Sequence, residues 1–102
     1  MQFIEDILHK GESETVEFKS SFNSAVIETL TAFANSKGGS VYVGISEKGK
    51  LTGVTVSSES VQQWVNEIKQ KTSPQLVPDI EIIKIIDTKV LVKVTISEYP
   101  VK

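Results

Sequence analysis

The sequence LTAFANSKGGSVYVGI, residues 30–45, joins the end of a helix directly to a strand that is apolar on both faces. Upstream, apolar residues recur at the spacing of one helical face, which predicts a helix over about residues 24–36. Lys37 and Gly38-Gly39 suit its end, because a cation is favourable there and glycine readily adopts a left-handed cap. Residues 40–45 contain few polar side chains, so we expect a central strand of the sheet.

The spacing of apolar residues outside this stretch predicts the remaining helices and strands. They are helices over residues 2–9 and 58–71, strands over 15–19, 51–54, 80–86 and 89–96, and a turn over 47–50. The predicted order is α-β-α-β-β-α-β-β. This order favours the α+β class, with a single mixed β-sheet and two main helices packed on one of its faces.

Length and composition limit what the chain can be. Its 102 residues suit one domain, and we expect the N-terminal module of a longer protein. There is no cysteine and one histidine, His9, so we expect no disulfide, no metal and no cofactor. The sequence shows no signal peptide and no apolar run of roughly 20 residues, which favours a cytoplasmic protein without a membrane partner. The net charge of −2 argues against a strong nucleic-acid binder, but leaves room for a local basic patch.

Two stretches of the sequence form a pair of signatures. The first is Gly11-Glu12-Ser13-Glu14-Thr15-Val16-Glu17-Phe18-Lys19. The second is residues 30–39, which run on through Val43-Gly44-Ile45 to Gly53-Val54. Together they resemble the signatures of the Schlafen/AlbA-like family of DNA-binding domains, and the resemblance spans about residues 9–96. It implies an AlbA-like fold, nucleic acid (DNA or RNA) as the partner, and a position at the head of a transcriptional regulator or helicase-related protein.

Carboxylates of the first signature are the candidate catalytic groups. In the ribonuclease branch of the family, two glutamates spaced as Glu12 and Glu17 join an aspartate, and three carboxylates could hold a divalent metal that activates water. The position matching that aspartate is Ser46, and a hydroxyl is a poor substitute for a charged oxygen ligand. We therefore expect no enzymatic activity, with Glu17 a solvated strand residue paired with a neighbouring lysine.

Lysines near the two signatures are the candidate nucleic-acid contacts. They are Lys19, Lys37, Lys48 and Lys50. Lys48 and Lys50 flank a turn glycine that could project as a finger along a phosphate backbone, where contacts supply sequence-independent affinity. The chain has no arginine, and Trp64 lies on the apolar stripe of its helix. We therefore expect weak, salt-sensitive binding without base-specific readout. The plain alternative is that these lysines only solubilise the surface.

Two further functions remain open from the sequence. One is a metal-dependent ribonuclease-like domain with an incomplete carboxylate triad. The other is a module that forms a homodimer or regulates a downstream ATPase or winged-helix domain, using apolar residues of the last hairpin. Cleavage of RNA would support the first function, and the oligomeric state in solution would test the second.

Overall fold

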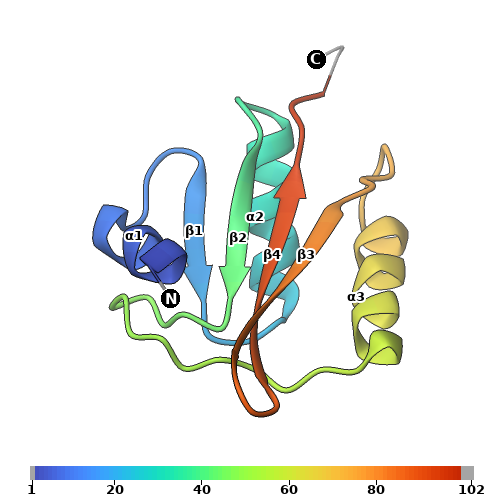
Figure 1. The fold of residues 1–102 in the computed structure, drawn as a ribbon. Helices are drawn as coiled ribbons and strands as arrows, with labels where there is room; N and C mark the ends of the chain where they lie inside the picture. The colour runs from blue at the N-terminus through green and yellow to red at the C-terminus, as the bar shows by residue number, and fades with distance from the viewer. Residues whose placement is uncertain (1, 100–102) are drawn as a thin grey trace.

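A computed structural model of the chain describes residues 2–99 (Figure 1). Its elements in chain order are α1 (Gln2–Lys10), β1 (Val16–Lys19), α2 (Ser24–Ala34), β2 (Gly39–Val43), α3 (Ser58–Lys71), β3 (Asp79–Ile86) and β4 (Lys89–Ile96). No helix within the described part is long and apolar enough to cross a membrane.

The strands form one mixed sheet in the order β1-β2-β4-β3. β1 and β2 run parallel and are connected through α2, whereas β4 is antiparallel to both β2 and β3. The β3–β4 hairpin turns at Asp87, whose φ of 51° lies in the left-handed region. The predicted α+β class with a single mixed sheet is confirmed.

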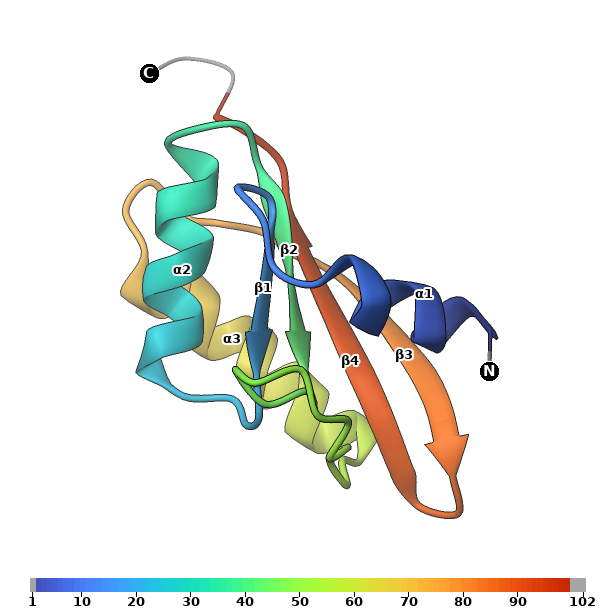
Figure 2. The same ribbon diagram turned by 90° about the vertical axis from the view of Figure 1, so that its left-hand side faces the viewer.

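Two apolar layers hold the helices on the sheet. On one face, Leu30 of α2 and Ile68 of α3 are buried against Val41 and Val94 of the sheet. On the opposite face lies α1, as Figure 2 shows, and its Ile7 belongs to the second cluster. The strand members of that second cluster are Phe18, Tyr42 and Leu91. We expected helices on one face only, but strands that are apolar on both sides need cover on both.

The short strand predicted over residues 51–54 is wrong. This segment makes only isolated bridges, Ile45 with Leu51 and Val54 with Val90. Its donors instead converge on the carbonyl oxygen of Gly44, which accepts from the Thr52 hydroxyl at 3.0 Å and from the Gly53 N–H at 2.7 Å. The Thr52 N–H donates to the same oxygen at 2.9 Å. These three bonds to one oxygen fold the segment back on itself, so it cannot extend beside β2.

Candidate functional site

The carboxyl ends of β1 and β2 lie together at the lower end of the sheet in Figure 1, beside the start of α2. A pocket of about 400 Å³ opens there. It is lined by Lys19, Ser20, Ser21, Asn23, Ala25, Ser46, Glu47 and Lys48. The pocket therefore lies outside the carboxyl ends of the one parallel strand pair in the described sheet.

Lys19 is the innermost cation of this pocket. It is the last residue of β1, and its carbonyl oxygen accepts from the N–H of Gly44 at 2.7 Å, which fixes its backbone against the end of β2. Its side chain is only 17% exposed, and its ammonium nitrogen lies 3.7 Å from a Glu17 oxygen and 3.6 Å from a Glu47 oxygen. Two carboxylates at this distance partly neutralise Lys19, so it is not a free cation.

Ser46 anchors the turn that carries Lys48 and Lys50. The N–H of Ser46 donates to the Lys50 carbonyl at 2.8 Å, and its hydroxyl accepts from the Lys50 N–H at 3.1 Å. Gly49 completes the turn with a φ of +84° and donates to the Ser46 carbonyl at 2.8 Å. Both lysine side chains are exposed, and no ion pair within residues 2–99 involves either of them.

Lys37 lies away from the other three predicted contacts. It precedes β2, whereas Lys19 and Lys48 lie beyond the carboxyl ends of β1 and β2, so the length of β2 separates them. Its ammonium group forms an exposed ion pair of 3.0 Å with Glu14. The structure thus gathers Lys19, Lys48 and Lys50 at one end of the sheet and places Lys37 at the other.

The carboxylates of the first signature are used within the fold. Glu12 accepts a hydrogen bond of 2.9 Å from the backbone N–H of Phe18, and Glu17 faces Lys19. Ser46, the residue at the position of the third ligand, has its hydroxyl bound to the turn. Within residues 2–99 no group of three His, Cys, Asp or Glu side chains could hold a metal ion. The third position thus carries a hydroxyl already engaged in the turn, and a hydroxyl is a poor substitute for a carboxylate ligand.

Asn23 and Trp64 each contribute to the fold through a contact within the domain. Asn23 is the N-cap of α2, where its side chain accepts from the Ala25 N–H at 3.0 Å. Trp64 stacks on Phe22 with ring centroids 4.7 Å apart and planes 7° from parallel. The Trp64 ring is therefore part of the packing between α3 and the loop before α2, as its place on the apolar stripe predicts.

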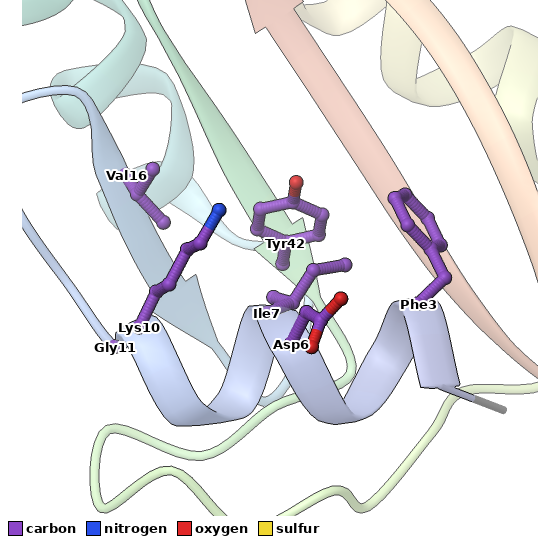
Figure 3. Close-up of a pocket in the computed structure, with 7 residues that line it drawn as sticks. All are labelled: Phe3, Asp6, Ile7, Lys10, Gly11, Val16 and Tyr42. Atoms are coloured by element: carbon purple, nitrogen blue, oxygen red, sulfur yellow. The ribbon is translucent and has the colours of Figure 1, made fainter.

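A second pocket, of about 300 Å³, lies under α1 and was missed by the sequence reasoning (Figure 3). Its lining is Phe3, Asp6, Ile7, Lys10, Gly11, Val16 and Tyr42. In Figure 3 Ile7 and Lys10 of α1 point towards the Tyr42 ring on β2, whereas Phe3 stands apart from it at the other end of the helix. Helical periodicity placed Ile7 on an apolar face, and the strand at residues 40–45, apolar on both sides, was the one signal that a second face of the sheet needs cover.

Comparison with known proteins relates the chain to one family. Residues 12–102 match the model of the family described as Schlafen, AlbA_2. No curated protein matches the chain at a significant level. The match includes all four strands, the pocket at the ends of β1 and β2, and the turn that carries Lys48 and Lys50, whereas α1 precedes it.

Proposed function

This chain belongs to the Schlafen, AlbA_2 family, and that membership suggests a nucleic-acid-related domain. We propose that the chain binds the phosphate backbone of DNA beside the pocket at the ends of β1 and β2. The observation that carries this proposal is the rigid turn that presents Lys48 and Lys50 next to that pocket, unopposed by any ion pair within residues 2–99. We further propose that the setting is a transcriptional regulator.

The chemistry of the pocket suits phosphate oxygens. Ammonium groups and hydroxyls are donors for phosphate, and the lining supplies Lys19, Lys48 and the hydroxyls of Ser20 and Ser21. Glu47 opposes an anion, because its carboxylate lies in the same lining. With three lysines and at least one carboxylate at this end, we expect weak binding that reads the backbone and not the bases.

Fluorescence anisotropy with labelled duplex and single-stranded DNA tests the proposal. We expect a Kd in the micromolar range or weaker at low salt. If Lys48 and Lys50 each neutralise one phosphate, a fourfold rise in salt should weaken binding roughly 12-fold. Absence of binding to either form of DNA at low salt would refute the proposal for this chain.

A matched pair of double variants locates the surface. Replacement of Lys48 and Lys50 by Glu should weaken binding at least about tenfold, because it reverses two unpaired charges on the turn. The control replaces Lys69 and Lys71, which lie on α3 with the same spacing and the same change in net charge. Equal losses in the two double variants would remove the 46–50 turn from the interface.

We also propose that the domain is not an enzyme. The bond between Glu12 and the Phe18 N–H, and the bond between the Ser46 hydroxyl and the turn, support this view, since they give both side chains a structural role. Bound nucleic acid would then not be chemically altered by the domain, and the function would depend on binding alone.

A further inference from the structure

The pocket under α1 contains a buried tyrosine whose hydroxyl has no partner in the fold. Tyr42 of β2 lines this pocket and is only 6% exposed. Its hydroxyl makes no hydrogen bond within residues 2–99, although a buried tyrosine usually finds a partner for its O–H. Since no fully buried side-chain oxygen or nitrogen of the described residues lacks a partner, this hydroxyl must reach solvent. A molecule in the pocket could therefore bond to it.

Two opposite charges also line the pocket without being paired. Asp6 and Lys10 lie four residues apart on α1 and so share one face of the helix, but neither forms an ion pair with any residue in the described part of the chain. Lys10 extends towards the Tyr42 ring in Figure 3. A second ammonium group, that of Lys93, lies 5.8 Å from the centre of the same ring. The surroundings of Tyr42 therefore favour a carboxylate, whereas Asp6 favours an ammonium group.

We propose that this pocket binds a free α-amino acid with an apolar side chain. The ligand carboxylate would accept from the Tyr42 hydroxyl and from Lys10, and the ligand ammonium group would donate to Asp6. The ligand side chain would contact Ile7 and Val16, which supply the apolar part of the lining. The pocket volume of about 300 Å³ lies at the lower end of the range for small-molecule sites, which suits a ligand of this size.

Charge balance selects this class over simpler ligands. A carboxylic acid without an amino group would leave Asp6 facing an anion, and an amine without a carboxylate would leave Lys10 facing a cation. A polar amino acid would leave Ile7 and Val16 without an apolar contact. A zwitterion with an apolar body satisfies all of these groups together.

This inference does not rest on binding of DNA. The pocket under α1 shares no residue with the pocket at the ends of β1 and β2. Most of its lining also precedes residue 12, where the match to the family model begins. The two sites can therefore be tested separately, and failure of one leaves the other standing.

An NMR titration of the whole chain with L-phenylalanine tests the binding. The amide signals of Ile7 and Tyr42 should shift and saturate with a Kd of about 1 mM or tighter. Two analogues serve as controls, since phenylpropanoic acid lacks the ammonium group and phenylethylamine lacks the carboxylate. Each should bind at least about fivefold more weakly. Absence of saturable shifts at about 10 mM phenylalanine, or equal binding of either analogue, would overturn the proposal.

Tyr42→Phe tests the hydroxyl while the ring stays in place. This variant should bind phenylalanine at least about tenfold more weakly, because a hydrogen bond to a carboxylate is lost. The matched control is Tyr99→Phe, which removes a hydroxyl that donates to the Pro74 carbonyl outside the pocket. Circular dichroism should show both variants folded. Equal affinities of Tyr42→Phe and the parent chain would contradict the proposed site.

Two further variants test which charge binds which group of the ligand. Asp6→Asn should remove the preference for phenylalanine over phenylpropanoic acid and keep the preference over phenylethylamine. Lys10→Gln should have the opposite effect. Glu5→Gln, an exposed position on α1 outside the pocket, should keep both preferences. Unchanged preferences in both pocket variants would show that the amino acid binds elsewhere and would overturn the proposal.

Discussion

The carboxylate of Glu12 accepts a 2.9 Å hydrogen bond from the backbone N–H of Phe18, six residues later. Phe18 lies on β1, an edge strand that pairs with β2 alone, so this N–H has no strand partner. Glu12 thus completes the backbone bonding of β1. The bond explains why a carboxylate at this position stabilises the fold without any metal.

Replacement of Glu12 by Ala should therefore lower the free energy of unfolding by about 1–2 kcal/mol, because it leaves a part-buried N–H without its charged acceptor. Urea denaturation followed by circular dichroism measures this change. The matched control is Glu14→Ala, which removes an exposed ion pair with Lys37 and should cost less than about 0.5 kcal/mol. Equal losses would show that the Glu12 bond contributes nothing specific.

Gly39→Ala should destabilise the protein by about 2–3 kcal/mol. An added Cβ at Gly39 would lie 2.8 Å from the Thr15 carbonyl oxygen and 2.8 Å from the Phe33 ring, so backbone and helix would have to move. The comparison is Gly11→Ala, where nothing lies within 4 Å and only the positive φ is unfavourable, at about 1 kcal/mol. Thermal or urea unfolding of both variants checks the difference, and a smaller loss at Gly39 would contradict the packing argument.

The stack of Phe22 on Trp64 should be visible in fluorescence. Trp64 is the only tryptophan, so its emission reports on this contact alone. Phe22→Ala should shift the emission to longer wavelength and remove the aromatic pair, which contributes about 1 kcal/mol beyond its buried area. Phe3→Ala, on the opposite face of the sheet, should leave the emission unchanged. An unshifted spectrum in Phe22→Ala would show that the stack does not form in solution.

Incubation with structured RNA and Mn²⁺ or Mg²⁺ should give no cleavage above a metal-only blank. The reason is that Glu12 and Ser46 already accept backbone hydrogen bonds, Glu17 is paired with Lys19, and a two-carboxylate remnant binds divalent metal poorly. Gel analysis over several hours measures this. Cleavage that disappears in Glu17→Gln would overturn the proposal that the domain is not an enzyme.

Local signals in the sequence predict most of the fold. The helix at 58–71 was bounded correctly, because Ser57 forms a capping box with Ser60 and the apolar spacing runs to the last turn. The hairpin of β3 and β4 was also found, since alternation surrounds a two-residue turn. The predicted strand at 51–54 failed because the carbonyl of Gly44 attracts donors from Thr52 and Gly53, a contact that no local pattern encodes.

The candidate site was predictable only in part. Lys48 and Lys50 are close in the chain, so their shared turn was expected and is present. Lys37 was grouped with them through its signature, but α2 carries the chain from the carboxyl end of β1 to the amino end of β2, which places Lys37 at the far end. The partial neutralisation of Lys19 by Glu47 also depends on contacts across elements.

The two outer edges of the sheet, along β1 and along β3, differ in whether their backbone groups are already hydrogen-bonded. Along β1, the outward N–H groups of Val16 and Phe18 are already bound, to the Ser13 carbonyl at 3.4 Å and to Glu12. Within residues 2–99, no hydrogen bond of this kind covers the outer edge of β3. A further strand could therefore be added at one edge of this sheet and not at both, so strand addition could not extend it into an open-ended fibre.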